Sequence, residues 1–298
     1  MTGLGALIKR NCKLFFKDKG MFFTSLITPA ILLVLYVTFL GNVYRDSFTA
    51  SIEGYMSVPE KLINATVGGE LFSSLLAVCC VTVAFCSNML MVQDKVSGSR
   101  RDITMTPVKK SVMAMGYYIA TFISTFIVCV IAAGLCFIYL VNVGWYLSAT
   151  DVVCILLDIV LLVLFGTALS SIINIFLSSQ GQISAVGTVV SAGYGFICGA
   201  YMPISQFGEG LRKVISFLPG TYGTSLIRNH ALRGVYKEMA DVGFPKEAVE
   251  GIKDSIDCNL YFFGDKVELN TMYLILGGAV TALIIIYILI NVCRKENN

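Results

Sequence analysis

The sequence predicts an all-α membrane protein with six transmembrane helices, on three observations. Of the 298 residues, 56% are hydrophobic and only 14% are charged, whereas soluble domains carry roughly 25% charged residues. Six stretches are long and apolar enough to cross a bilayer, which takes about 20 residues. Basic residues are concentrated in alternate loops. This composition excludes an ordinary soluble enzyme, a disordered chain and a nucleic-acid-binding protein.

The six predicted spans are long runs almost without charge, at residues 21–41, 71–92, 111–141, 152–177, 182–202 and 271–292. Only the fourth contains a charged residue, Asp158. We therefore divide the chain into an N-terminal amphipathic helix (1–20), a six-span transmembrane domain (21–292) and a short tail (293–298). The domain includes a basic loop (93–110) and a long outer segment (203–270).

Lysine and arginine counts in short loops predict the orientation of the spans. Twelve basic residues precede the first span, lie in the basic loop or follow the last span: Lys9, Arg10, Lys13, Lys17, Lys19, Lys95, Arg100, Arg101, Lys109, Lys110, Arg294 and Lys295. The short loops between the first and second spans and between the third and fourth spans contain only two basic residues, Arg45 and Lys61. Both termini are therefore predicted to be cytoplasmic, and the outer segment faces the opposite side.

The first 20 residues predict a helix that lies along the membrane surface. Apolar residues recur at helical spacing, while Arg10, Lys13 and Lys17 line another face. Such a helix lies in the interface with its cations toward anionic headgroups. The alternative is a simple basic stop before the first span.

The outer segment divides in two. Residues 203–219 are half apolar, too short to span and too apolar for a free loop, which predicts a re-entrant or interfacial helix. Residues 245–257 predict a short surface helix, with Pro245 in its first turn. Together they form a small outer cap.

The potential metal ligands give no site. Seven of the ten cysteines lie inside apolar runs, where they act as small hydrophobic residues. His230 is the only histidine, and no cysteine and histidine spacing fits zinc. We therefore predict no metal site and no catalytic residue.

Two motifs carry a family resemblance. The basic loop contains Gly98, Ile103 and Thr106-Pro107-Val108, and the second motif runs through Gly199, Pro203, Pro219, Tyr222, Arg228, Arg233 and Gly234. Both motifs lie at matching positions relative to the predicted spans. They resemble those of ABC type-2 export permeases, the transmembrane subunits of bacterial drug or polysaccharide exporters. Leu218 departs from the family pattern, which often has asparagine there.

The resemblance implies a partnership with a motor protein. Two such permease chains, identical or different, pair in the bacterial plasma membrane and dock on two cytoplasmic ABC ATPase subunits. ATP and magnesium are then bound by the ATPase, and this chain binds no cofactor. The sequence agrees, because it has no G-x-x-x-x-G-K-[ST] phosphate loop. The chain is therefore predicted to be a transport subunit and not an enzyme.

The resemblance also implies that the basic loop contains the coupling helix that touches the ATPase. The candidate coupling residues are Asp94, Lys95, Gly98, Arg100, Arg101 and Asp102. Charged side chains can anchor such a contact through charge-assisted hydrogen bonds. The alternative is that the basic residues of the loop only set the topology.

A second group of candidates concerns the transport pathway. Phe39, Phe196, Tyr201 and Phe207 are candidates to line an apolar pathway or gate, and alternatively face lipid or the core. Asp158 is the one charge inside a predicted span, where carboxylates are costly. It pairs with a cation such as Arg212 or Lys213, contacts substrate, or reaches water near the interface.

The leading functional hypothesis is an exporter of a hydrophobic, amphipathic or lipid-linked substrate that works by alternating access. Few charges lie along the predicted spans, which suits apolar cargo better than a free polyanion. The alternative is a proton-driven secondary transporter. Such a transporter needs several ionisable residues inside the spans to relay protons, and Asp158 is the only charged residue there.

Overall fold

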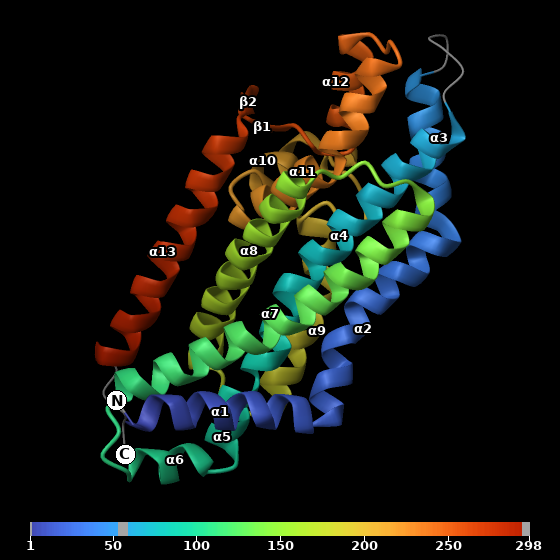
Figure 1. The fold of residues 1–298 in the computed structure, drawn as a ribbon. Helices are drawn as coiled ribbons and strands as arrows, with labels where there is room; N and C mark the ends of the chain where they lie inside the picture. The colour runs from blue at the N-terminus through green and yellow to red at the C-terminus, as the bar shows by residue number, and fades with distance from the viewer. Residues whose placement is uncertain (1, 53–58, 294–298) are drawn as a thin grey trace.

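A computed structural model describes residues 2–52 and 59–293 of the chain. Figure 1 shows a bundle of long helices, with several short elements around α10 and α12 at one end and helices α1, α5 and α6 at the other. The start of α1 and the last turn of α13 lie at the same end. The predicted tail beyond Cys293 lies outside the described residues.

Most of the long helices correspond to predicted spans. In chain order they are α2 (Lys19–Leu35), which continues through the π-helical turn η1 (Tyr36–Leu40) into α3 (Gly41–Ile52), then α4 (Glu60–Asn88), α7 (Lys110–Val143), α8 (Ala149–Phe176), α9 (Gln180–Ile197) and α13 (Leu269–Cys293). Five helical segments are long and apolar enough to cross a membrane: Lys19–Asp46, Glu60–Val96, Lys110–Val143, Ala149–Phe176 and Leu269–Cys293. These confirm an all-α membrane protein.

The predicted fifth span differs from the others. Its segment forms α9, a helix of 18 residues, but α9 is not among the five segments that are long and apolar enough to cross a membrane. Glutamine, glycine and serine residues make this helix less apolar than its neighbours. The count of six spans therefore stays a prediction.

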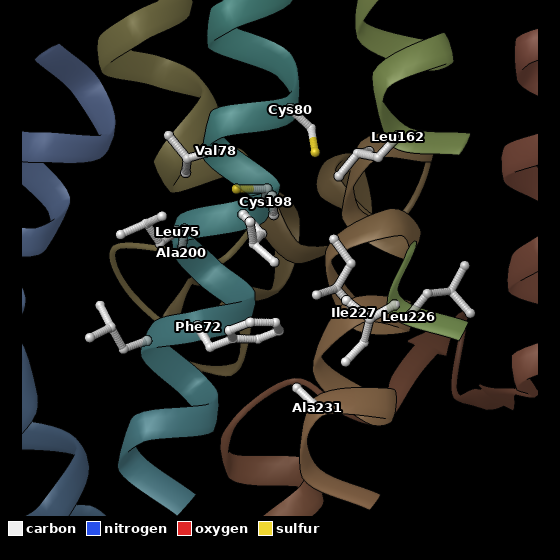
Figure 2. Close-up of a cluster of buried hydrophobic side chains, with 14 of the residues drawn as sticks. Phe72, Leu75, Val78, Cys80, Leu162, Cys198, Ala200, Leu226, Ile227 and Ala231 are labelled. Atoms are coloured by element: carbon white, nitrogen blue, oxygen red, sulfur yellow. The ribbon is translucent and has the colours of Figure 1, made fainter. Parts of the chain in front are cut away.

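Helix α4 forms the centre of the bundle. Its most apolar stretch is 94% buried, whereas those of α7 and α13 are 22% and 17% buried. Small residues along α4 allow close approach of its neighbours, as is usual between membrane helices. A Cβ atom at Gly69 would overlap Leu232, and Gly166 of α8 packs against the backbone of Cys80. Figure 2 shows Cys80 of α4 on the side of Leu162 of α8, and Phe72 of α4 on the side of Ile227 of α11.

The outer segment contains one long helix that the sequence analysis does not predict. Helix α11 (Pro219–Asp241) begins with Pro219 in its first turn and packs against α4, α8 and α13. Most of its first 21 residues are buried. Its serines, threonines and charged residues keep its mean hydropathy low, so a search for apolar spans passes over it.

The remaining outer elements are short. They are η2 (Ile204–Gln206), α10 (Glu209–Ile215), α12 (Lys246–Ser255), and an antiparallel hairpin of β1 (Leu260–Phe262) and β2 (Asp265–Val267). These two strands are the only ones in the part of the chain that the structure describes. Helix α12 occupies the segment predicted as a surface helix, and its Val249 and Ile252 face the core.

At the opposite end, α1 (Thr2–Lys17) lies across the bundle (Figure 1). Gly116 of α7 leaves space for Leu7, because a Cβ atom there would lie 3.1 Å from the Cβ of Leu7. The Asp18 side chain accepts a hydrogen bond from the backbone N–H of Met21 and caps α2. Helix α1 therefore packs across the end of the bundle, and its location along the membrane surface stays a prediction.

Close packing of α11 gives a first prediction. A Cβ atom at Gly234 would overlap the backbone carbonyl of Tyr146, which precedes α8. We expect Gly234→Ala to lower the free energy of unfolding by about 1–3 kcal/mol, seen as a melting temperature in detergent several degrees lower. Gly251→Ala on α12 is the matched control, because nothing lies within 4 Å of its Cβ position. Equal melting temperatures for the two variants would contradict the prediction.

Candidate functional site

The predicted coupling loop folds into two short helices, α5 (Leu90–Val96) and α6 (Ser99–Thr104). Gly98 joins them with a φ of 83°, in the left-handed region that glycine adopts at little cost. The chain can therefore reverse sharply, and α6 lies at the edge of the bundle beside α1 (Figure 1).

Asp94 lies inside the protein and not on the surface of the loop. Its carboxylate oxygens accept hydrogen bonds from the guanidinium of Arg10 at 2.6 and 2.9 Å, and from the hydroxyl of Tyr117 at 2.6 Å. Only 4% of Asp94 is exposed. A two-bond contact of this kind fixes orientation as well as distance. Asp94 therefore ties α5 to α1 and α7.

Lys95 ties the same loop to α8. Its ammonium group donates hydrogen bonds of 2.8, 2.9 and 3.1 Å to the backbone carbonyls of Asn174, Ile175 and Leu177. These carbonyls lie at the C-terminal end of α8, where helices leave carbonyls unpaired and favour positive charge. Lys95 is thus a cap for α8.

The exposed part of the loop is α6. Arg101 and Asp102 are exposed, Arg100 is partly exposed, and Met105 just after the helix is 83% exposed. The six candidate residues therefore separate by location. Asp94 and Lys95 hold the loop on the bundle, and Gly98 shapes the turn. Arg100 is partly covered, and Arg101 and Asp102 face outward.

A second group of polar residues surrounds Arg228 in α11; we call it the Arg228 cluster. The guanidinium lies 2.6 Å from a carboxylate oxygen of Glu70 and donates hydrogen bonds of 3.1 Å to the Ser74 hydroxyl and the Gly199 carbonyl. Asp257 lies 3.7 Å away on the other side. Only 1% of Arg228 is exposed.

Asp257 connects this cluster to η2. Its side chain accepts hydrogen bonds from the backbone N–H groups of Ile204 and Ser205, at 2.6 and 3.4 Å. Burial raises the pKa of the Asp257 carboxyl to about 6, against the opposing effect of the Arg228 charge. The cluster thus joins α4, the end of α9, η2 and α11.

The sequence alone did not reveal this cluster. The predicted second span begins at residue 71, directly after Glu70, and Arg228 is named only within a motif. In the structure α4 begins at Glu60, so Glu70 lies well inside a helix. A carboxylate directly before an uncharged run of 23 residues was the available signal.

Asp158 forms a third buried group, on α8. One carboxylate oxygen lies 2.6 Å from Nδ1 of His230, and the other accepts a 2.5 Å hydrogen bond from the hydroxyl of Tyr273. The predicted pairing with Arg212 or Lys213 is wrong, because both are exposed on α10. His230, which the sequence places in the outer segment, lies on α11 and faces the bundle. Asp158 therefore links α8, α11 and α13.

The aromatic pathway candidates do not form one cluster. Phe196 and Tyr201 contact each other edge to face, with ring centres 5.0 Å apart. Phe39 on η1 is 62% exposed, and Phe196 is 50% exposed. Phe207 is partly buried against the core. A shared lining role for the four residues stays a prediction.

A comparison with known families identifies the chain. A family model described as ABC-2 type transporter matches residues 2–231. The chain belongs to the ABC-2 type transporter family. It is therefore a permease component of an ABC transporter, a multi-pass membrane protein with a transport role and not a catalytic one. ABC ATPase partners follow from the family. None of the curated proteins compared with the chain matches it.

The matched region of this permease covers α1 through most of α11. It includes the Arg10–Asp94 contact, α6, Glu70, Arg228, Asp158 and His230. Asp257, α12, the hairpin and α13 lie beyond it. Among residues 2–52 and 59–293, no group of three histidine, cysteine, aspartate or glutamate side chains is placed to hold a metal ion.

The Arg228 cluster generates a second prediction. Replacing Arg228 with glutamine leaves Glu70 and Asp257 buried without their cation, which costs about 3–5 kcal/mol in comparable buried pairs. We expect a large fall in the melting temperature of the purified permease in detergent. Arg212→Gln makes the same change at an exposed position and should melt like the wild type. A wild-type melting temperature for Arg228→Gln would refute the role of the cluster.

The raised pKa of Asp257 gives a third prediction. An unfolded aspartate titrates at about pH 4, so the folded permease holds this proton more tightly than the unfolded chain. The contribution of Asp257 to folding is therefore full below about pH 4 and is lost as the pH rises through 6. The loss is on the order of 2–3 kcal/mol.

Thermal unfolding in detergent between pH 4 and pH 7 measures this contribution. Asp257→Asn cannot titrate, and its amide oxygen can still accept one of the two backbone hydrogen bonds, the shorter one from Ile204. The variant should therefore lack this part of the fall in stability. Parallel pH profiles for the variant and the wild type would show that Asp257 does not titrate as described.

Proposed function

We propose that the chain is the permease subunit of an ATP-driven exporter that moves a hydrophobic, amphipathic or lipid-linked substrate outward. The observation that carries the proposal is the position of α6. Its Arg101 and Asp102 side chains are exposed, while Asp94 and Lys95 fix the adjacent turn to α1, α7 and α8. A coupling element needs this combination of an exposed contact surface and a firm internal attachment.

The internal attachments supply a route for movement through the permease. A push on α6 reaches α1 and α7 through Asp94 and reaches the end of α8 through Lys95. Helix α8 is joined in turn to α11 and α13 by Asp158, His230 and Tyr273. Buried charged contacts resist separation, because an unpaired charge in this environment is costly. We therefore propose that these helices move together when α6 is displaced.

The remaining parts of the proposal concern the assembly. Two permease chains, identical or different, pair in the bacterial plasma membrane with α1 and α6 on the cytoplasmic side. ATP and magnesium are bound by the ABC ATPase subunits and not by this chain. Binding of ATP switches the pair between inward-open and outward-open states, so that the substrate leaves on the side of α12. The apolar character of the spans supports an amphipathic substrate.

A second candidate function is proton-driven transport, and one observation favours it. Asp158, His230 and Tyr273 form a hydrogen-bonded group of ionisable side chains inside the bundle. Ionisable residues within membrane segments often mark proton pathways. The family and the absence of inverted repeats in the sequence favour the ATP-driven mechanism.

Inside-out vesicles containing the permease and its partner ABC ATPase test the proposal. The probes are an NBD-labelled phospholipid, followed by its protection from dithionite, and the amphipathic dye Hoechst 33342. We expect ATP to drive movement of at least one probe into the vesicle or its inner leaflet in the presence of a proton ionophore. Arg101→Glu should reduce this movement roughly ten-fold, because it reverses a contact charge.

Matched variants separate the alternatives. Arg212→Glu makes the same charge change at the opposite end of the bundle and should leave ATP-driven movement unchanged. Movement that persists without ATP, needs a proton gradient and disappears in Asp158→Asn would instead establish proton-driven transport. Wild-type coupling in Arg101→Glu would remove α6 from the mechanism.

A further inference from the structure

A pocket of about 470 Å³ lies between α11, α12 and the first turn of α13. Four cationic side chains line it, together with a single carboxylate, Glu250: Arg233, Lys237, Lys246 and Lys253. The pocket is separate from the Arg228 cluster and from the coupling loop at the other end of the bundle. Its excess of positive charge points to an anionic ligand.

Existing contacts leave part of this charge uncompensated. Arg233 lies 3.2 Å from Asp151, and Lys253 lies 2.7 Å from Glu250. Glu250 is also shared with Lys266, which lies 2.7 Å from its other oxygen. Within residues 2–52 and 59–293, Lys237 and Lys246 form no ion pair, and both are exposed. These two lysines are therefore available to a ligand.

The rest of the lining is apolar. Phe244, Val249 and Leu269 contribute to the wall, and Tyr236 lies under the ammonium group of Lys253 at 5.2 Å from its ring centre. A small, fully hydrated anion has no use for such a surface. A ligand with an anionic head and an apolar body can contact both kinds of side chain.

The position of the pocket relates it to the membrane surface. Leu269 is the first residue of α13, and Asp151, the partner of Arg233, lies in the first turn of α8. Helices α8 and α13 are both candidate membrane spans, so the pocket lies where two spans begin. Figure 1 shows α12 and the start of α13 at the end of the bundle opposite α1 and α6. Phospholipid headgroups occupy this level of a membrane.

We propose that this pocket binds an anionic phospholipid of the leaflet on the α12 side of the membrane. Lys237 and Lys246 donate charge-assisted hydrogen bonds to the phosphate oxygens, Arg233 adds positive potential, and Phe244, Val249 and Leu269 contact the apolar part of the lipid. A zwitterionic lipid is a poorer ligand, because its ammonium group meets the same cations. The inference does not depend on the direction of transport or on the ATPase.

A neighbouring pocket provides the control. It has a volume of about 590 Å³ and contains Arg212 and Lys213. It has no excess of positive charge, because three carboxylates, Glu209, Asp254 and Asp257, also line it, and Glu209 pairs with Lys213 at 3.0 Å. Removing two cations there changes the net charge of the same end of the chain without altering the proposed site.

The experiment measures lipid retention by the purified full-length chain in detergent, using native mass spectrometry. The probes are phosphatidylglycerol and phosphatidylcholine, added separately at equal concentrations. We expect the wild type to retain several-fold more phosphatidylglycerol. The double variant Lys237→Gln/Lys246→Gln should reduce that retention by roughly five-fold for each lysine removed, whereas Arg212→Gln/Lys213→Gln should retain it as the wild type does.

Other results would overturn the proposal. Equal retention of the two lipids, unchanged retention in the Lys237/Lys246 variant, or an equal loss in the control would each show that the pocket is not a specific anionic lipid site. Complete displacement of the lipid by millimolar inorganic phosphate would identify a free-anion site instead. Both variants change exposed side chains, so equal melting temperatures in lipid-free detergent are expected and exclude misfolding as the cause of a loss.

Discussion

The buried guanidinium of Arg228 is the constraint on which the arrangement of the outer half depends. A permanent positive charge without access to water requires nearby anions and hydrogen-bond acceptors. Glu70, Ser74, Gly199 and Asp257 provide them, and they come from three separate parts of the chain. The contacts of Arg228 therefore fix the positions of α4, the end of α9 and the segment around Asp257 relative to α11.

The same design recurs at the two other polar groups. Asp94 joins α5 to α1 and α7, and Asp158 joins α8 to α11 and α13. Within a bilayer, apolar surfaces gain little by leaving lipid for one another, so packing and polar contacts select which helices associate. Small residues along α4 permit the close packing, and the polar groups specify the partners. The result is a bundle whose helices are joined at both ends as well as in the middle.

Features that depend on local sequence were predictable. Long uncharged runs locate five spans because the thickness of the bilayer fixes their length. The amphipathic pattern marked α1. Contacts between distant residues were not predictable in this way. For Asp158 the sequence offered a cation, a substrate contact or water near the interface, whereas a histidine and a tyrosine hold it. Helix α11 was not predicted, because its polar residues are buried by tertiary contacts.

The functional residues show the same division. The sequence grouped Asp94 and Lys95 with the charges of α6, because a run of charged residues in a loop reads as one surface. Each side chain in fact turns inward toward a partner on another helix. Only the charges that follow Gly98 include fully exposed groups. Neighbouring charged residues in a sequence can therefore have different roles. The orientation of each side chain decides whether it holds the loop on the bundle or remains exposed for a partner.

The contact between Arg10 and Asp94 also bears on the order of biosynthesis. Arg10 leaves the ribosome early, but its acceptor follows 84 residues later, and Tyr117, which completes the contact, lies later still in α7. Helix α1 is thus synthesised first, but its contact with Asp94 and Tyr117 forms only after α5 and α7 have been made. Until then this contact is incomplete, so this end of the permease is completed after much of the bundle has been synthesised.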